Sequence, residues 1–392
     1  MNNIFKIFSF CLALLLTINA FSQEQKEEKQ EEGYKFTEIK KLKVTSVKDQ
    51  YRSGTCWSFS GIGFIEAELL RMGKGEYDFS EMFIVRKAYE DKAKQYIRWH
   101  GSVNFGGGGA FHDVIQMIKK YGIVSEEQYS GLNYGDTAHI HGEIDAILKA
   151  YLDAVKQNPN KKLSNAWFDG YCGILDVYFG KINATPIKQE VLGLNMDNYV
   201  EITSFTHHPF YEKFILEVPD NWMFDEVYNV KLDEMMEIID NALNNGYTVA
   251  WGADVSEKGF SWTKGVAVVP SEDRPDLSGL EREKWEKLST KEKEALLYSF
   301  DKPLKEKQIT QEMRQDGFDN YQTTDDHGML ICGIAKDQNG NKFYIVKNSW
   351  NTTNAYKGYL YASEAFVKLK TIDIAVHKDA IPKNLKKTLE IK

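Results

Sequence analysis

Cysteine is scarce in this sequence: four of the 392 residues are cysteine. This scarcity excludes a disulfide framework as the basis of the fold. Cys11 lies in an apolar leader, so three cysteines would remain after removal of the leader, and an odd number leaves at least one thiol unpaired. Cys56 is the natural candidate for the free thiol. Cys172 and Cys332 could pair, but we interpret them as separate buried thiols.

The sequence also lacks an excess of positive charge, since its formal net charge is −8. We therefore expect no broad nucleic-acid surface and no nucleic-acid partner. The run Gly106–Gly109 lacks the form of a phosphate-binding loop. His139 and His141, and the doublet His207 and His208, have no Cys, Asp or Glu partner at a recognisable ligand spacing. The sequence thus predicts neither a metal site nor a cofactor.

Beyond the start of the chain there is no apolar run long enough to span a bilayer. Residues 7–21 are mostly apolar, and Ala20-Phe21-Ser22 fits the small-x-small rule of signal-peptide cleavage. We predict a signal peptide over residues 1–22 and an exported protein, periplasmic or extracellular, with no membrane association after cleavage. An uncleaved anchor is the alternative. The composition of residues 23–33, which are rich in Gln, Glu and Lys, is typical of a solvated, charged tether.

The remainder has the composition of a globular protein, with 42% hydrophobic and 13% aromatic residues in the whole chain. Apolar periodicity predicts helices over residues 56–72, 110–121, 145–157 and 232–245, and charged surface helices within 279–315. Strands are expected over 247–252, 328–335, 342–347 and 358–362, with a turn at 337–340. Helices dominate the first part and strands the last, so the fold class is predicted to be α+β, with two lobes facing each other across a cleft.

Three polar side chains carry the clearest chemical signal. Cys56 stands in Gly54-Thr55-Cys56-Trp57, and His327 and Asn348 follow far downstream. A thiol, an imidazole and an amide are the parts of a thiolate nucleophile with an oriented general base. Cys56 would begin a helix, where the free amide donors and the helix dipole favour thiolate. Gln50, six residues earlier, is a candidate oxyanion donor.

The three blocks that carry these residues resemble those of papain-like cysteine peptidases, whose nucleophile lies in C-G-[SA]-C-[WY]. This chain has Ser53 in place of the first cysteine and Thr55 in place of the small residue. His327 follows Cys56 by 271 residues (327 minus 56), against about 130–150 in simple papain-like enzymes. The extra length resembles the bleomycin hydrolase and aminopeptidase C branch. The resemblance implies a two-lobe papain-like domain over residues 34–382, with a helical lobe and an antiparallel β lobe, an insertion at roughly 130–318, and a tail over 383–392.

The resemblance also implies a role for each matching residue. Cys56 would attack the scissile carbonyl, and His327 would pair with the thiolate and then protonate the leaving amine. Asn348 would orient the imidazole, and Gln50 would donate to the oxyanion together with the backbone N–H of Cys56. The residues expected around the substrate are Gly108 and Gly109, which would bind its backbone, the carbonyl of Asp326, Trp57, and Trp350, which would shield the His327–Asn348 hydrogen bond from water.

The expected function is therefore a cysteine-type peptidase acting on peptide substrates, in the manner of an aminopeptidase C. In this branch a C-terminal arm reaches into the cleft and limits cleavage to the substrate's N-terminal residue. After Pro382 this chain has ten residues, so we expect no such arm and hypothesise dipeptidyl or internal cleavage. A non-catalytic, peptide-binding member of the fold and acyl transfer to an amine are further alternatives. The resemblance also implies a homo-oligomer, a hexamer.

Overall fold

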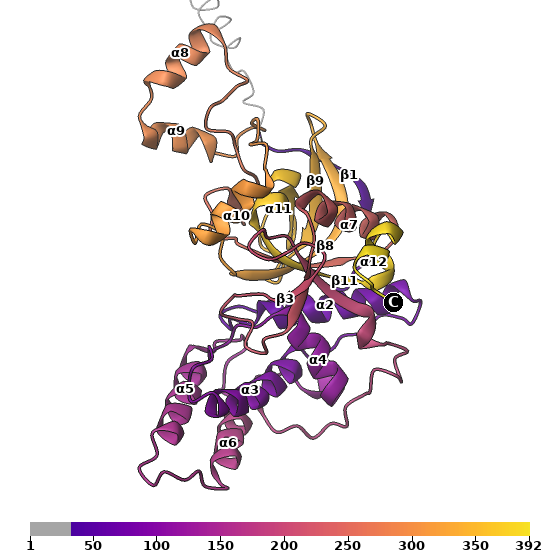
Figure 1. Cartoon of the computed structure of the whole chain (residues 1–392), viewed down its shortest axis with the longest axis vertical. Helices are drawn as coiled ribbons and strands as arrows, with labels where there is room; N and C mark the ends of the chain where they lie inside the picture. The colour runs from indigo at the N-terminus through magenta and orange to yellow at the C-terminus, as the bar shows by residue number, and fades with distance from the viewer. Residues whose placement is uncertain (1–32) are drawn as a thin grey trace, which may run out of the picture.

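The structure is a computed structural model that describes residues 33–392. The predicted signal peptide, and the predicted tether up to residue 32, lie outside the described residues. The rest of the chain forms a helical lobe and a sheet lobe, shown below and above the centre of Figure 1. The predicted α+β class is confirmed.

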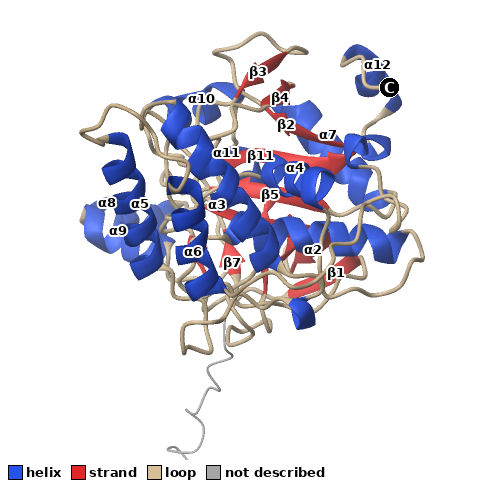
Figure 2. Cartoon of the chain, turned by 90° about the horizontal axis from the view of Figure 1, so that it is seen from below, coloured by secondary structure: helices blue, strands red, loops and turns tan. Residues whose placement is uncertain are grey.

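The helical lobe consists of five helices that cover one side of the sheet (Figure 2). They are α2 (Cys56–Arg71), α3 (Glu81–Arg98), α4 (Phe111–Tyr121), α5 (Gly142–Lys156) and α6 (Trp167–Phe179). Their apolar faces share one core with Ala250, Leu330 and Ala375 of the sheet, so the two lobes are joined by packing. Two glycines interrupt the apolar face of α2. A Cβ at Gly61 would lie 2.7 Å from Val114 Cγ2, so this glycine lets α4 approach α2 closely.

Eleven strands form the sheet, in the order β3-β4-β2-β11-β5-β8-β9-β10-β7-β6, and β1 pairs with β8. Their bounds are β1 (Phe36–Lys41), β2 (Tyr199–Thr203), β3 (Lys213–Ile215), β4 (Glu226–Asn229), β5 (Val249–Ala253), β6 (Phe260–Ser261), β7 (Val266–Ala267), β8 (His327–Asp337), β9 (Lys342–Lys347), β10 (Tyr359–Ser363) and β11 (Thr371–His377). The expectation of a purely antiparallel lobe is wrong, because β2 pairs with β4, and β7 with β10, in parallel.

The remaining helices belong to the sheet lobe. They are α7 (Leu232–Asn244), α8 (Gly279–Lys287), α9 (Thr290–Leu297), α10 (Gln311–Asp319), α11 (Glu364–Lys370) and α12 (Lys383–Thr388), and short 3₁₀ turns lie at Glu126–Gln128, Met196–Asn198 and Lys378–Ala380. Helix α7 buries its apolar face against the sheet in a core that it shares with α11 and α12. Helices α8 and α9 stand away from the sheet (Figure 1).

Residues 130–318 contribute to both lobes. They supply α5 and α6 to the helical lobe and the central strand β5 to the sheet. Within the described part of the chain all three cysteines are free thiols. None of the helices over residues 33–392 is both long and apolar enough to cross a membrane.

Candidate active site

Cys56 is the first residue of α2 and faces a narrow cavity between the lobes. The turn before it depends on Gly54, whose φ of +66° lies in the left-handed region. No side chain caps the helix, so the first backbone N–H groups remain available to a ligand. Burial raises the pKa of the Cys56 thiol to about 12, although hydrogen bonds from the backbone of Gly328 and Trp57 act in the opposite direction.

His327 is the first residue of β8, the strand on which α2 packs. Its Nε2 lies 2.7 Å from Asn348 Oδ1, and the same oxygen accepts a hydrogen bond from the backbone N–H of Ser349 at 2.7 Å. The backbone donor fixes which amide atom is the oxygen, so Nε2 carries the proton and Nδ1 has a free lone pair. The indole ring of Trp350 stacks on the imidazole, with ring centroids 4.5 Å apart.

The structure brings Cys56 and His327 to the same cavity, one from each lobe. Gly328, which hydrogen-bonds the thiol, directly follows His327 in β8. Burial also lowers the pKa of His327, to about 4, despite the hydrogen bond to Asn348. Desolvation therefore favours the neutral thiol and the neutral imidazole, whereas the backbone hydrogen bonds to the thiol and the hydrogen bond from the imidazole to Asn348 favour the ion pair.

Gln50 lies beside this pair but does not line the cavity. Its Oε1 accepts a hydrogen bond from Ser349 Oγ at 2.6 Å, and its backbone N–H donates to Ser349 O at 2.9 Å. Because the carbonyl oxygen of the side chain is occupied, its Nε2 remains as the donor. Asn348, Ser349 and Gln50 thus form one buried group behind the imidazole.

The glycine run forms another wall, to which Gly109 and Trp57 contribute. Trp57 Nε1 donates to Gly107 O at 2.8 Å. Lys92, a buried residue of α3, donates through Nζ to the carbonyl of Gly108 at 2.5 Å. A Cβ at Gly108 would lie 2.0 Å from Asp220 Oδ2, so the carboxylate uses the space that the glycine leaves. No sequence pattern indicated the role of Lys92, which lies in a helix that the periodicity did not predict.

Asp326 also lines the cavity, as expected for a residue next to His327. Its carboxylate accepts hydrogen bonds from Ser256 N at 3.1 Å and Thr324 Oγ1 at 2.8 Å. Despite partial burial, these bonds and the neighbouring Asp254 lower the pKa of Asp326. The side chain is thus tied to the loop before β8.

Sequence reasoning missed the other acidic residues of the cavity. Glu201 of β2, Asp220, Asp325 and Asp373 of β11 all line it, and His112 of α4 is the one histidine among the lining residues besides His327. His112 Nδ1 lies 2.9 Å from Glu201 Oε2. Burial opposes protonation of His112, but the Glu201 carboxylate, together with Asp113 and Asp225, outweighs it and raises the pKa of His112 to about 10. One signal was available in the sequence: Asp373 interrupts the apolar run of β11.

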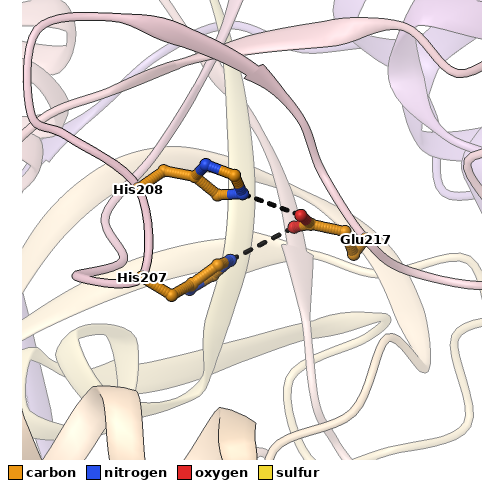
Figure 3. A group of neighbouring side chains, drawn as sticks. All are labelled: His207, His208 and Glu217. Atoms are coloured by element: carbon orange, nitrogen blue, oxygen red, sulfur yellow. Dashed lines mark hydrogen bonds and ion pairs between the residues drawn. The ribbon is translucent and has the colours of Figure 1, made fainter.

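The histidine doublet lies outside the cavity, and the statement that it has no acidic partner is wrong. Glu217 accepts from His207 Nε2 at 3.1 Å and from His208 Nε2 at 2.7 Å (Figure 3), and the three side chains form a group that could hold a metal ion. Gln315 Oε1 accepts from the backbone of Thr206 at 2.5 Å, which turns its Nε2 towards His207 Nδ1 at 3.0 Å. His207 therefore carries its proton on Nε2, where it meets Glu217, and the group is satisfied by its own hydrogen bonds. His139 and His141 are buried, and burial lowers the pKa of His139 to about 4.

Comparison with known proteins indicates the class of enzyme. A papain family cysteine protease model matches residues 33–172, and a peptidase C1-like family model matches residues 293–392. The aminopeptidase C of Lactobacillus helveticus is 22% identical over 87% of this chain and 81% of its own length, and that of Listeria innocua is 21% identical over 86% and 81%. The chain is a papain-family cysteine peptidase with aminopeptidase C relatives.

A solved structure shows the same fold. The crystal structure of pepw from Lactobacillus rhamnosis HN001 superimposes with a TM-score of 0.67 and 16% sequence identity, over 100% of this chain and 95% of that chain. The predicted papain-like fold is thereby confirmed.

Proposed function

We propose that this peptidase hydrolyses peptide bonds through Cys56, His327 and Asn348. The observation that carries the proposal is the shared cavity of Cys56 and His327, together with the 2.7 Å contact between His327 Nε2 and Asn348 Oδ1. In this arrangement His327 Nδ1 accepts the thiol proton, and the Cys56 sulfur attacks the scissile carbonyl. The protonated imidazole then protonates the leaving amine, and water releases the acyl group from the sulfur by the reverse sequence.

The tetrahedral oxyanion requires donors placed where its charge develops. We assign this role to the Gln50 amide and the backbone N–H of Cys56. The occupied Oε1 of Gln50 and the uncapped first turn of α2 support the assignment, because both leave donors available. Gly108, Gly109, Trp57 and the Asp326 carbonyl are assigned to the substrate backbone and its surroundings, whereas Trp350 covers the imidazole.

Aminopeptidase action is the first candidate for the mode of cleavage, since the relatives are named aminopeptidase C. A specific observation favours a second candidate, dipeptidyl or internal cleavage. Residues 383–392 are absent from the described lining of the cavity, and Leu385 and Leu389 of the α12 region are buried in the sheet core. No side chain of residues 383–392 therefore blocks the cavity.

Blocked and free peptides distinguish the two modes. The reduced protein is incubated with a peptide library, once with free amino termini and once N-acetylated, and the products are identified by mass spectrometry. Cleavage after the first residue of free peptides alone establishes the aminopeptidase and excludes the second candidate. Internal products from the acetylated library establish the second candidate. If neither library is cut by the wild-type chain, or if Cys56→Ala cuts as fast as the wild type, the proposed function is wrong.

We also propose that the chain is exported and loses residues 1–22. Amino-terminal sequencing of the protein from its native host tests this, because cleavage predicts a mature chain that begins at Gln23. An intact amino terminus in a cytoplasmic fraction would contradict it. The homo-oligomer remains a proposal that sedimentation analysis can test.

A further inference from the structure

Lys92 is a buried cation that the proposed chemical steps do not use. It lies on α3 of the helical lobe, and it stands behind the glycine run rather than in the lining of the cavity of Cys56. Burial lowers the pKa of Lys92, although the carboxyl groups of Asp113, Asp220 and Asp145 act in the opposite direction. An ammonium group away from water is costly to keep in a fold unless it is paired or hydrogen-bonded. A lysine in this position therefore needs strong partners.

The partners of the Lys92 ammonium group are mostly backbone carbonyls of the glycine run. Its Nζ donates to Gly106 O at 3.0 Å and to Gly108 O at 2.5 Å. Nζ also lies 5.3 Å from the centroid of a Trp222 ring, which is within the range of a cation–π contact. An ammonium group has three N–H donors, so two of them are used by the carbonyls. Lys92 thus holds two carbonyl groups of the glycine run at once.

Neighbouring side chains hold the rest of the glycine run. Trp57 Nε1 donates to Gly107 O at 2.8 Å. Trp222 Nε1 donates to Asp113 Oδ2 at 2.7 Å, and the same oxygen accepts a hydrogen bond from Ala110 N at 3.1 Å. The backbone is therefore fixed on both sides of the last glycine of the run, and Trp222 connects the two sets of contacts, since it also meets the ammonium group of the lysine.

The peptide unit between Gly108 and Gly109 connects Lys92 to the cavity, because Gly109 lines the cavity. In a trans peptide unit the C=O of one residue and the N–H of the next point in opposite directions. Lys92 holds the carbonyl of Gly108, so the N–H of Gly109 points away from Lys92. Over residues 33–392 this N–H has no hydrogen-bond partner. It is therefore available as a donor to a ligand.

We propose that Lys92 is a positioning residue: by holding the carbonyl of Gly108, it aims the N–H of Gly109 at a backbone carbonyl oxygen of the peptide substrate. The inference rests on the proposed function, in which the glycine run binds the substrate backbone. Lys92 acts through the glycines and takes no part in the chemical steps. Asp220 supports the arrangement, since its carboxyl group faces the ammonium group and occupies the space that Gly108 leaves.

Binding to the Cys56→Ala chain tests this role without requiring turnover. Tetra-alanine amides, with the amino terminus free or acetylated, carry sulfur in place of one backbone carbonyl oxygen at a time, and calorimetry gives each dissociation constant. Because sulfur is the weaker acceptor, the replacement should weaken binding about two- to tenfold at the position that meets Gly109. Added Lys92→Met should abolish this loss at that position alone, which is a coupling between the two changes. Added Lys94→Met, at a half-exposed position on the same helix, should leave the loss unchanged.

A uniform loss of affinity in Lys92→Met, with every effect of sulfur unchanged, would overturn the proposal and assign Lys92 to the fold alone. No effect of sulfur at any position, or no binding of any peptide, would overturn it as well. If Lys92→Met does not fold, Lys92→Gln takes its place, because glutamine is uncharged and shorter by one methylene and should reduce the effect of sulfur at the same position. If neither variant folds, Lys92 serves the fold and the proposal is wrong. Absence of hydrolysis by the wild type refutes the proposed function but leaves these binding results valid.

Discussion

Substitution of Asn348 by alanine tests the positioning of the imidazole. Asn348 Oδ1 accepts two hydrogen bonds of 2.7 Å, from His327 Nε2 and from Ser349 N. Alanine leaves both donors buried without this acceptor. Loss of a buried hydrogen bond of this kind costs about 1–3 kcal/mol. Since about 1.4 kcal/mol corresponds to a tenfold change in rate, a cost of this size predicts that kcat/KM falls by about 5- to 150-fold.

The loss should fall on kcat, because Asn348 acts through the imidazole and does not touch the substrate. Trp350 still stacks on the ring in the variant, so part of its orientation is retained and the loss should be smaller than that of Cys56→Ala. Steady-state kinetics on the best peptide give kcat and KM separately, and thermal unfolding shows whether the variant is folded. Asn244→Ala, at an exposed position at the end of α7, is the matched control. A folded Asn348→Ala enzyme with kcat within twofold of the control would refute the reasoning.

Three further predictions concern the surroundings of the site. In the folded protein the pKa of His112 is raised from 6.5 to about 10. The protonated side chain therefore stabilises the fold fully below pH 6.5, and this contribution is lost as the pH rises through 10. The wild type should thus have a larger free energy of unfolding in urea than His112→Gln, and this difference should shrink by up to about 4 kcal/mol between pH 6 and pH 10, at about 1.4 kcal/mol for each unit of pKa. A difference that is independent of pH would contradict this. Burial raises the pKa of Asp373 well above its ordinary value, so stability is lost as pH rises above about 4. Asp373→Asn should therefore raise the melting temperature at pH 7, by about 1 °C for each kcal/mol gained in a chain of this size; a lower melting temperature would count against the explanation. Gly108→Ala places a Cβ 2.0 Å from Asp220 Oδ2 and should lower kcat/KM by about tenfold or more. Gly106→Ala, whose added Cβ has no atom within 4 Å, should match wild type. Equal kinetics for the two variants would argue against the close contact between residue 108 and Asp220.

Parts of the fold could be predicted from local sequence. The apolar repeat of residues 56–72 predicted α2 to within a residue of its observed end, and the apolar run of 342–347 predicted β9. Helix α3 was missed because Arg86, Glu90 and Lys92 are buried on it, and such charges obscure an apolar repeat. Their burial depends on partners elsewhere in the chain, such as Asp176 for Arg86.

The residues of the site likewise fall into those that local sequence indicates and those that only the tertiary structure brings together. Cys56, His327 and Asn348 lie in recognisable blocks, so the sequence could indicate that they meet. The acidic pocket has no local pattern, because Glu201 and Asp373 belong to strands 172 residues apart (373 minus 201) that become neighbours only when β2 pairs with β11. Glu217 likewise becomes the partner of the histidine doublet only through the fold of the chain between them. Contacts that depend on tertiary structure leave little trace in composition or periodicity.

Covalent labelling of the reduced protein with a thiol-directed peptidyl epoxide is the most direct test of Cys56 as the nucleophile. The chain has three described thiols, of which Cys56 alone lines the cavity with His327. Intact mass and peptide mapping should show one adduct, on Cys56, and peptide hydrolysis should decline in proportion to the labelled fraction. Hydrolysis that persists when Cys56 is fully labelled, or an adduct confined to Cys172 or Cys332, would contradict the account.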